Sequence, residues 1–452
     1  MDKGSNTTNS IVAIATAQGV SSISIIRVSG DAALSIAHKI SHLENIVPRY
    51  AHLTSLYNVS DTLIDQAIMI YFVAPYSFTG ENIVEFQCHG GMIVAQEILD
   101  SIVSYGVRLA QPGEFSKRAF LNGKIDLTEA EAISKLIEAK SLDAVKILAK
   151  QMKGELKTFV DESREVLLRS LAYSEVMIDY AEEDIPENIM DSITTQLDGL
   201  SNQILDIVNI SHKRKGLIEG FKVAIIGKPN VGKSSLLNAL LSYDRAIVSD
   251  IEGTTRDTIE EQVRIGSHII RLVDTAGIRD SEDIIEKIGI ERSLSSMEDA
   301  DVVIALFDAS RLFDIEDKNI LLLLQNIHNK HIIVAVNKID LPTKLDSTKL
   351  HEYDVLEVSA KKSFVKLTER LEALFDSIGE GDELMLVSTR QIEAVNNTKQ
   401  SIDDARQPLE DGELEFFSYH LKEAVKHISS ISKPFDNEEI LDKMFGEFCL
   451  GK

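Results

Sequence analysis

Apolar residues follow two different periods along this chain, and the change from one period to the other divides it into segments. Up to about residue 118, short β-rich runs are separated by two helical stretches, at 31–40 and 92–105. The β-rich runs are 11–15, 22–28, 66–73 and 83–88. This mixture contains no phosphate-binding loop and predicts a small α+β domain for ligand binding or dimerisation.

From about 127 to 183 the apolar period becomes helical. Apolar side chains recur at steps of three and four, or multiples of these, which predicts one long stripe in the core of a helical bundle. The stripe consists of Val145, Leu148, Met152, Leu156, Phe159, Leu167, Leu171 and Ile178. Helical periods return at 389–407, 413–430 and 437–445.

Between the helical parts, residues 217–378 alternate β-branched strands with helices, as expected of a doubly wound α/β sheet. We therefore expect a multidomain α/β plus α protein, in which this domain is inserted into a discontinuous helical domain. The predicted limits are 1–118 for the α+β domain, 119–216 and 379–452 for the two helical parts, and 217–378 for the inserted domain.

The inserted domain begins with a nucleotide motif. The apolar run 221–226 stops at Gly227, and G-K-P-N-V-G-K-S precedes a helical run. Between a strand and a helix, this spacing is that of a P-loop, whose glycines let backbone N–H groups point at phosphate oxygens. Lys233 would reach the β- and γ-phosphates, and the Ser234 hydroxyl would bind Mg²⁺. A plain glycine-bearing turn is the alternative, but it does not explain the motifs that follow.

Those motifs come in the order of a guanine-nucleotide switch. Thr255, in G-T-T-R-D, can close over Mg²⁺ and the γ-phosphate, and D-T-A-G at 274–277 follows a second strand. N-K-I-D ends at Asp340, whose carboxylate can accept from both N1–H and the 2-amino group of guanine, a pairing that adenine cannot make. S-A-K at 359–361 fits the loop that supports the base. Together the motifs resemble the translation-factor-like branch of P-loop GTPases.

The predicted GTP-binding residues are Asn230, Val231, Gly232, Lys233, Ser234, Ser235, Ser249, Asp250, Ile251, Glu252, Gly253, Thr254, Thr255, Asp274, Thr275, Ala276, Gly277, Asn337, Lys338, Asp340, Ser359, Ala360 and Lys361. Lys233 is also assigned a catalytic role, and Ser234 and Thr255 are the predicted Mg²⁺ ligands.

Charge limits what else the chain binds. Its formal net charge is −25, and the one compact basic run, H-K-R-K at 212–215, is interpreted as a solvated linker. A protein that holds RNA by its phosphates usually has a basic face, so this chain alone is not expected to hold RNA tightly. The sequence has no run of 18 apolar residues, and its two cysteines, Cys88 and Cys449, form no Cys-x-x-Cys pair. We expect a cytoplasmic protein.

His89 follows Cys88 directly, and the pair could suggest a metal site or a nucleophile. No second pair of ligands accompanies it, so a structural histidine at the end of a strand is the favoured interpretation.

Five further motifs carry a family resemblance. They are I-R-V-S-G at 26–30, F-T-G-E at 78–81, C-H-G-G at 88–91, P-G-E-F…R-A-F-L-N-G-K at 112–124, and a final C-L-G-K. Together with the inserted P-loop domain they resemble, over essentially the whole chain, the MnmE (TrmE) family of bacterial tRNA modification GTPases. One departure is 17–22, A-Q-G-V-S-S, where the family often has a glycine-rich turn.

The resemblance implies a homodimer formed through the N-terminal domain, which binds a one-carbon tetrahydrofolate (5-formyl or 5,10-methylene). It also implies a partner flavoprotein, MnmG, which carries FAD, uses NADH and joins the chain in a heterotetramer or larger assembly. Together they add a carboxymethylaminomethyl or aminomethyl group to C5 of the wobble uridine of tRNA. By position, the folate contacts are Arg27, Glu85, Lys124 and Lys452, and Cys449 matches the family's C-terminal cysteine, assigned here as catalytic.

For GTP hydrolysis, Ile278 stands where Ras-like proteins have a glutamine that orients water. The resemblance implies that Glu286 does so through a bridging water; without it, Glu286 would be interpreted as a charge on a helix face. It also implies a potassium ion, bound by Asn230 and by Ser249, Ile251 and Thr254, and completed when two GTPase domains meet. Arg256 is the alternative source of positive charge, as a built-in arginine finger.

A different function class stays open. A ribosome-assembly or other regulatory GTPase would use the flanking domains to bind RNA or protein, with no one-carbon chemistry. A basic RNA-binding domain would favour it, whereas the folate-type N-terminal motifs and the terminal C-x-G-K favour tRNA modification.

Overall fold

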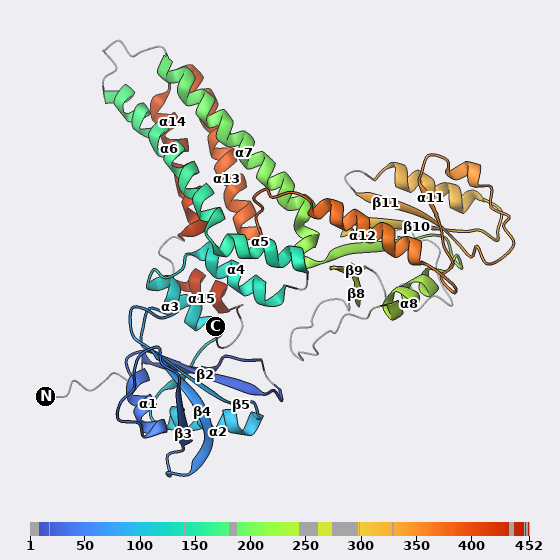
Figure 1. Ribbon diagram of the computed structural model, residues 1–452. Helices are drawn as coiled ribbons and strands as arrows, with labels where there is room; N and C mark the ends of the chain where they lie inside the picture. The colour runs from blue at the N-terminus through green and yellow to red at the C-terminus, as the bar shows by residue number, and fades with distance from the viewer. Residues whose placement is uncertain are drawn as a thin grey trace. The chain divides into compact units, whose positions relative to one another are not determined.

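The computed structural model describes residues 9–17, 19–139, 141–179, 188–243, 261–273, 297, 299–327, 330–433, 438–446, 448 and 451. The chain forms two compact units (Figure 1). Unit 1 comprises Met1–Ile137, Gln151–Leu200 and Glu393–Lys452, and unit 2 comprises Glu138–Lys150 and Ser201–Ile392. The predicted fold class is confirmed: unit 1 holds an α+β sheet and helices, and unit 2 a doubly wound sheet.

Unit 1 begins with a six-stranded sheet in the order β3-β4-β5-β2-β1-β6. Its strands are β1 (Ile11–Ile14), β2 (Ile23–Ser29), β3 (His52–Tyr57), β4 (Leu63–Phe72), β5 (Ile83–His89) and β6 (Arg108–Leu109). Helices α1 (Ala33–Ser41) and α2 (Met92–Ser104) contribute with the sheet to one hydrophobic core. On the opposite face, Phe115 of α3 (Glu114–Leu121) packs against Ile11 and Ala13. The remainder of that face carries the side chains that alternate away from the core.

The helical parts are α4 (Leu127–Glu138), α5 (Leu142–Met152), α6 (Glu155–Asp179), α7 (Asn188–Glu219), α13 (Thr389–Asp411), α14 (Leu414–Ser432) and α15 (Glu438–Gly446). In unit 1, α6 and α14 pack along each other, and the hydroxyls of Ser174 and Ser418 are 2.5 Å apart (Figure 1). The prediction of one long apolar stripe is wrong in part. The chain breaks between α5 and α6 at Gly154, where φ is +85°, and Val145 and Met152 are 40% and 37% exposed.

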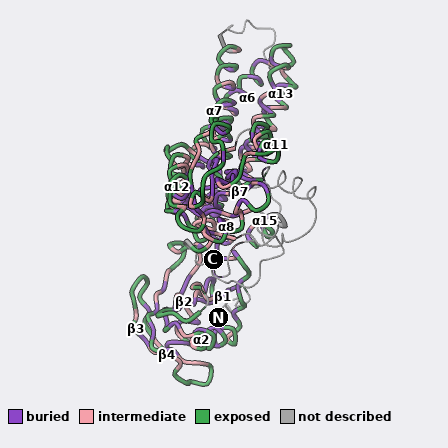
Figure 2. The backbone as a smooth tube through the Cα atoms, turned by 90° about the vertical axis from the view of Figure 1, so that its right-hand side faces the viewer, coloured by how far each residue is buried: buried purple, intermediate pink, exposed green. Residues whose placement is uncertain are grey.

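Unit 2 is built on a six-stranded sheet in the order β12-β11-β10-β7-β9-β8, parallel except for β8. The strands are β7 (Phe221–Ile226), β8 (Glu261–Ile265), β9 (His268–Leu272), β10 (Val302–Asp308), β11 (His331–Asn337) and β12 (Val355–Glu357), and a short 3₁₀ helix spans Ser347–Leu350. Every residue of β10 is buried, as expected of a central parallel strand covered on both faces. Figure 2 shows the buried positions along the chain.

Helices cover both faces of this sheet. Helices α8 (Lys233–Tyr243) and α12 (Val365–Gly379) share one hydrophobic core with the strands. Helix α11 (Ile315–Gln325) shares the other. The P-loop lies between β7 and α8, at the carboxyl edge of the sheet, which is where ligands bind in folds of this kind.

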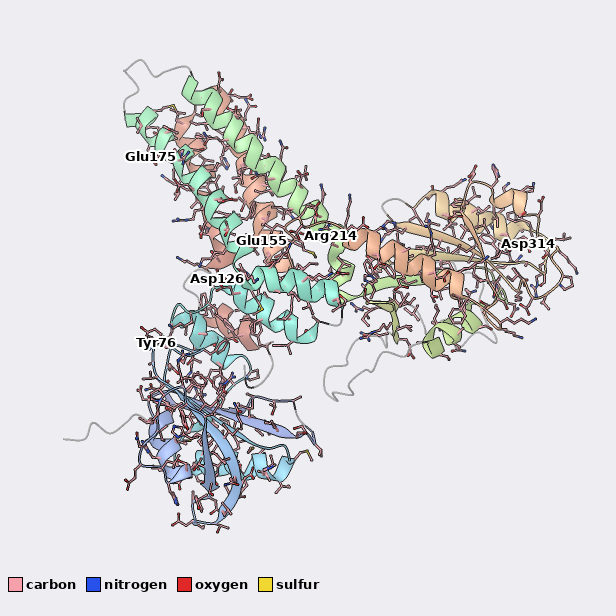
Figure 3. The ribbon with its side chains drawn as sticks, in the orientation of Figure 1. Tyr76, Asp126, Glu155, Glu175, Arg214 and Asp314 are labelled. Atoms are coloured by element: carbon pink, nitrogen blue, oxygen red, sulfur yellow. The ribbon has the colours of Figure 1, made fainter. Side chains whose placement is uncertain are left out.

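Arg214 holds together the two segments by which the chain enters and leaves this sheet. Figure 3 labels Arg214. Its Nε donates to the carbonyl of Ile378 at 3.1 Å, and its guanidinium also contacts Glu380 O and, at 2.8 Å, the carboxylate of Glu383. The prediction of a solvated linker at 212–215 is wrong for this residue. Arg214 lies in α7 and is 9% exposed. Its charge can be buried because the segment that follows α12 supplies its hydrogen-bond acceptors.

Candidate nucleotide-binding site

The phosphate loop has the backbone shape that its glycines predict. Gly227 and Gly232 adopt φ values of +155° and +106°. A Cβ at Gly227 would lie 2.5 Å from the carbonyl oxygen of Leu306, and one at Gly232 would lie 2.3 Å from Nδ2 of Asn337. Neither position leaves room for a side chain, so the loop passes directly over the end of β10 and under the base loop.

Lys233 begins α8 and turns back toward the loop. Its Nζ donates to the carbonyls of Gly227 at 2.7 Å and Lys228 at 3.0 Å, and burial lowers the pKa of its ammonium. Ser234 and Ser235 follow in the first turn of α8. A helix N-terminus with a lysine folded over its preceding loop is a ready site for phosphate oxygens.

Asn337 joins the base loop to the phosphate loop. It ends β11 and is 2% exposed. Its amide nitrogen donates to the carbonyl of Val231 at 2.9 Å, and its amide oxygen accepts from the backbone N–H of Ala360 at 2.9 Å. This buried amide therefore connects the predicted loops 230–235, 337–340 and 359–361 in one hydrogen-bonded unit.

Lys338 makes a second connection to the phosphate loop. Its Nζ donates to the carbonyl of Asn230 at 2.6 Å and to Oδ2 of Asp308 at 2.7 Å. Asn230 and Lys338 both have a φ of +65°, a left-handed conformation that non-glycine residues adopt only when their surroundings hold them there. The lysine thus fixes the backbone of the loop as well as its own strand end.

Asp340, the predicted base contact, is held by a hydrogen bond from Ser359. Its Oδ1 accepts from the hydroxyl of Ser359 at 2.7 Å, and this hydrogen bond lowers the pKa of Asp340, with Lys362 and Lys361 adding to the effect. An ionised carboxylate that is held by a buried serine fits the two adjacent N–H donors of a guanine edge.

Asp308 is a site residue that the sequence motifs did not identify. It is 2% exposed and lies opposite Asn337 in the parallel register of β10 and β11. Burial alone would raise its pKa, but hydrogen bonds from Lys338 and Ser310 outweigh that effect and lower it. The sequence does contain a sign of this residue: Asp308 ends the otherwise apolar strand V-V-I-A-L-F-D. A buried carboxylate in such a position needs a cation as partner.

Several predicted residues lie outside the described part of the chain. These are the switch residues 249–255 with Arg256, the D-T-A-G motif at 274–277, Glu286, Cys449 and Lys452.

The described part of unit 1 includes three of the four predicted folate contacts, Arg27, Glu85 and Lys124. Arg27 Nε is 2.8 Å from Glu85 Oε1, on the face of the sheet that α1 and α2 do not cover. The guanidinium carbon lies 5.9 Å from the ring centre of Phe78 and 5.7 Å from that of Phe115. Lys124 lies against Gly80, where a Cβ would be 3.0 Å from its Cε.

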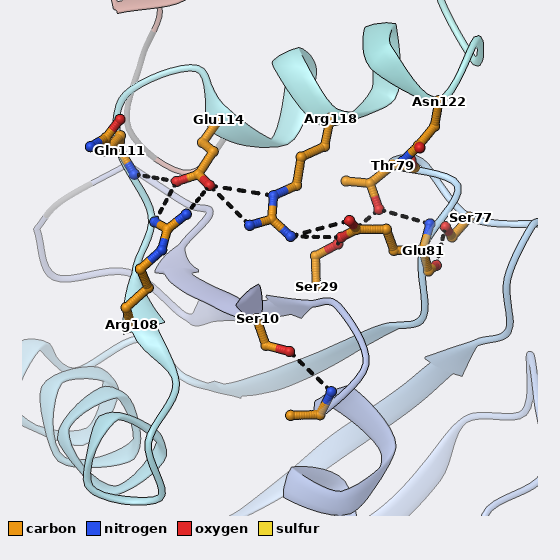
Figure 4. A network of polar contacts seen from close by, with 11 residues as sticks. Ser10, Ser29, Ser77, Thr79, Glu81, Arg108, Gln111, Glu114, Arg118 and Asn122 are labelled. Atoms are coloured by element: carbon orange, nitrogen blue, oxygen red, sulfur yellow. Dashed lines mark hydrogen bonds and ion pairs between the residues drawn. The ribbon is translucent and has the colours of Figure 1, made fainter. Parts of the chain in front are cut away.

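A chain of ion pairs holds the loop that carries Phe78 to α3 (Figure 4). Arg118 contacts Glu114 at 3.0 Å and Glu81 at 2.9 Å, and Glu114 also pairs with Arg108. Glu81 accepts from the hydroxyl of Ser29 at 2.8 Å. The ion pair between Arg118 and Glu81 therefore joins the motifs F-T-G-E and R-A-F-L-N-G-K in space.

The pair Cys88 and His89 does not form a shared site. Cys88 is buried, its Sγ donates to the carbonyl of Ser24, and burial raises its pKa to about 11. His89 points to the other face and bonds Oδ1 of Asp65 at 2.7 Å. Among the described residues, no group of three or more metal-ligating side chains comes together.

The doubly wound sheet, the P-loop and the oriented Asp340 define unit 2 as a guanine-nucleotide-binding domain of the P-loop class. Two family profiles match the chain: the "GTP-binding protein TrmE N-terminus" over residues 10–124 and the "MnmE helical domain" over 127–449.

Curated relatives match over nearly the full length. The chain is 79% identical to the tRNA modification GTPase MnmE of Sulfurovum sp. (strain NBC37-1), over 98% of this chain and 99% of that protein. It is 57% identical to the tRNA modification GTPase MnmE of Aliarcobacter butzleri (strain RM4018), with the same coverage. A crystal structure of Era with MgGDPNP and a 16S ribosomal RNA segment is 28% identical over 40% of this chain and 66% of that one, with a TM-score of 0.27. The chain belongs to the MnmE family of tRNA modification GTPases.

Proposed function

We propose that this GTPase takes part in adding a carboxymethylaminomethyl or aminomethyl group to C5 of the wobble uridine of tRNA, with a one-carbon folate as carbon donor and a flavoprotein as partner. One observation carries the proposal beyond GTP hydrolysis. The described part of the C-terminus docks on the N-terminal domain: Lys117 of α3 pairs with Asp442 of α15 at 2.5 Å, and Gly451 lies against Ile14 and Ala15.

The position of Gly451 gives the terminal C-x-G-K motif a structural meaning. Gly451 is buried with φ at +89°, and a Cβ there would lie 2.5 Å from the carbonyl oxygen of Ile14. This close approach supports the assignment of Cys449 as a catalytic thiol and of Lys452 as a folate contact, in a site shared with the N-terminal sheet. A plain C-terminal tail would have no need of a glycine at such a contact.

The chemistry of the N-terminal residues suits a reduced folate. Glu85 can accept from the adjacent N–H groups of a pterin ring, and Arg27 can bind a carbonyl or carboxylate oxygen. Phe78 and Phe115 offer ring faces near the guanidinium, and Lys124 adds a positive charge beside the loop. A one-carbon tetrahydrofolate, 5-formyl or 5,10-methylene, would supply the carbon unit when bound here.

The uncovered part of the same sheet face fits a second copy of the chain. Leu53, Ile68 and Ile23 are 70%, 40% and 56% exposed on it, and their burial in a homodimer would be favourable. We assign the dimer to the N-terminal domain, residues 1–118, and keep 119–216, 217–378 and 379–452 as the limits of the other parts.

For the GTPase step, we assign the water-orienting role to Glu286 and a potassium site to Asn230, Ser249, Ile251 and Thr254, completed when two GTPase domains meet. Support comes from the left-handed backbone of Asn230, whose carbonyl is held by Lys338, because a fixed backbone limits the directions that the side chain can take. Mg²⁺ would be bound by Ser234 and Thr255.

The partners follow from charge and chemistry. A net charge of −25 suits a chain that holds tRNA mainly together with another protein. The partner, MnmG by family, would carry FAD and form a heterotetramer or larger assembly with the homodimer. None of the described helices is long and apolar enough to cross a membrane, and we place the reaction in the cytoplasm.

Equilibrium binding of 5-formyltetrahydrofolate to the purified chain tests this proposal. We expect saturable binding that Glu85→Gln abolishes, while the GTP hydrolysis rate of that variant stays unchanged. Glu165→Gln, which alters an exposed pair with Arg169, serves as the matched control and should bind normally. Intact GTP hydrolysis with no folate binding by the unaltered chain would favour a regulatory GTPase instead.

A further inference from the structure

Lys228, the residue after the first glycine of the P-loop, is a buried lysine. It is 5% exposed, and its Nζ lies 2.6 Å from Oδ2 of Asp314 and 2.6 Å from Oδ2 of Asp317. Burial alone would lower its pKa, but the hydrogen bonds that the ammonium donates to the two carboxylates outweigh that effect and raise it. The ammonium is thus charged and held between two acidic groups beneath the phosphate loop.

Both carboxylates belong to the start of α11, and Asp314 is labelled in Figure 3. Oδ1 of Asp314 accepts from the backbone N–H groups of Glu316 at 3.0 Å and Asp317 at 3.2 Å. Oδ2 of Asp317 accepts in return from the N–H of Asp314 at 3.1 Å. This reciprocal capping box fixes both acidic side chains to a helix end, so the ammonium of Lys228 is attached to a rigid support.

The main chain of Lys228 contacts Lys233, the lysine predicted to bind the phosphates. Its carbonyl, with that of Gly227, accepts from Nζ of Lys233. The orientation of the Lys233 ammonium therefore depends on the peptide that Lys228 carries. A continuous set of contacts leads from the α11 cap through the Lys228 side chain and backbone to the lysine that would contact the β- and γ-phosphates.

We propose that Lys228 is a positioning residue for GTP hydrolysis, which holds Lys233 in line with the phosphates by anchoring the P-loop to Asp314 and Asp317. Transition-state charge develops on the phosphate oxygens that Lys233 faces, so a small error in the direction of its ammonium costs rate more than it costs ground-state binding. The P-loop motif does not require a lysine at this place, because it leaves the position variable.

A purely structural ion pair makes a different prediction. Breaking a buried pair destabilises a fold, but a folded fraction with an undisturbed loop would hydrolyse GTP at the normal rate. The two roles separate in the kcat of the folded protein, measured well below its unfolding temperature.

The first experiment uses Lys228→Met and Lys228→Arg in the full chain, in single-turnover GTP hydrolysis. We expect Lys228→Met to lower the rate between about 10-fold and 100-fold, the range for a displaced catalytic group, with a smaller loss in GDP affinity. Lys228→Arg should restore most of the rate, since a guanidinium can bridge two carboxylates. A normal rate in Lys228→Met, together with a lower Tm, would overturn the proposal.

A second variant guards against misfolding. Asp314→Asn keeps a side-chain oxygen that can cap α11, since asparagine is a good N-cap residue, but replaces the carboxylate oxygen that binds Lys228 with an N–H donor. It should lower the rate in the same direction, and the double variant with Lys228→Met should be no slower than Lys228→Met alone. Fully additive losses would contradict one shared link. Arg370→Met, which removes an exposed pair with Asp354 in the same unit, should leave the rate unchanged.

Discussion

The amide nitrogen of Asn337 donates to the carbonyl oxygen of Val231 across 2.9 Å, so one buried side chain ties the base-binding loop to the phosphate-binding loop. The two loops are far apart in sequence, but they follow strands β7 and β11 of the same sheet. A displacement of either loop therefore displaces the other. We expect base recognition and phosphate binding to be lost together when this hydrogen bond is broken.

Gly232→Ala should show that dependence. The added methyl group would lie 2.3 Å from Nδ2 of Asn337, and φ at Gly232 is +106°, which alanine adopts only with strain. We expect GTP and GDP affinity to fall at least about tenfold, since a displaced charge-assisted bond is worth roughly 1.5–3 kcal/mol. Fluorescent nucleotide titration gives the measurement. Gly199→Ala is the control: nothing lies within 4 Å of its Cβ position, so its affinity should be normal, and near-normal binding by Gly232→Ala would contradict the geometry.

Asp340→Asn should change base choice. The substitution keeps an oxygen for Ser359 but places a donor toward the guanine 2-amino group, which suits the O2 of xanthine better. GTP affinity should drop at least about tenfold, by loss of a bond worth roughly 1.5–3 kcal/mol, while XTP affinity rises. Competition titrations with both nucleotides decide the outcome. Unchanged GTP binding would remove Asp340 from the base site.

Glu114→Gln should weaken folding in a pH-dependent way. Burial alone would raise the pKa of Glu114, but hydrogen bonds from Arg108, Gln111 N–H and Arg118 lower it from 4.5 to about 2. A group with a depressed pKa stabilises the fold fully above its unfolded value and loses this contribution as pH falls toward its folded value. The shift corresponds to roughly 3 kcal/mol near neutral pH.

Urea unfolding of the wild type and Glu114→Gln tests this at about pH 7 and at about pH 4, just below the unfolded-state pKa of the carboxyl. The difference in unfolding free energy should be largest at the higher pH and smaller at the lower one. Glu165→Gln, with an exposed carboxylate, should show little difference at either pH. A gap that is independent of pH would mean that Glu114 acts by shape rather than by charge.

Potassium should accelerate GTP hydrolysis over sodium at equal ionic strength. Positive charge at the bridging phosphate oxygen can be worth about 10³–10⁵ in rate, so even partial loss of the ion should cost at least about tenfold. Stopped-flow hydrolysis in KCl and NaCl measures the ratio. Asn230→Ala should abolish the difference and Arg256→Ala should preserve it; equal rates in both salts with collapse only in Arg256→Ala would assign the role to the arginine.

Much of the nucleotide site could be predicted from sequence because its motifs follow strands that run in parallel. The carboxyl ends of β7 and β11 meet at one sheet edge, so 227–234 and 337–340 had to converge. The partner of an isolated buried charge could not be predicted in the same way. Asp308 and Lys228 find theirs through side chains on other elements, and no local period reports such pairs.

The N-terminal domain was predictable in its elements but less so in its pairings. Strand β3, His52–Tyr57, mixes polar and apolar residues and was not predicted. The contact between Arg27 and Glu85 depends on the register of β2 and β5, and a slip of one residue would place the two side chains on opposite faces. The burial of Arg214 was missed because a run of basic residues is ordinarily solvated.

The contacts of Arg214 with Ile378 and Glu383 also affect the order in which the parts of the chain fold during synthesis. Ser174 of α6 meets Ser418 of α14, 244 positions later, so this helix pair cannot form until most of the chain has left the ribosome. Closing so long a loop carries an entropic cost that grows with its length. Once the GTP-binding sheet has folded and Arg214 has bonded to Ile378 and Glu383, the segments still open between Ser174 and Ser418 are 175–213 and 384–417. We therefore expect the nucleotide domain to fold first. Once folded, it would hold the ends of the two helical parts close together, so that α6 and α14 can pack.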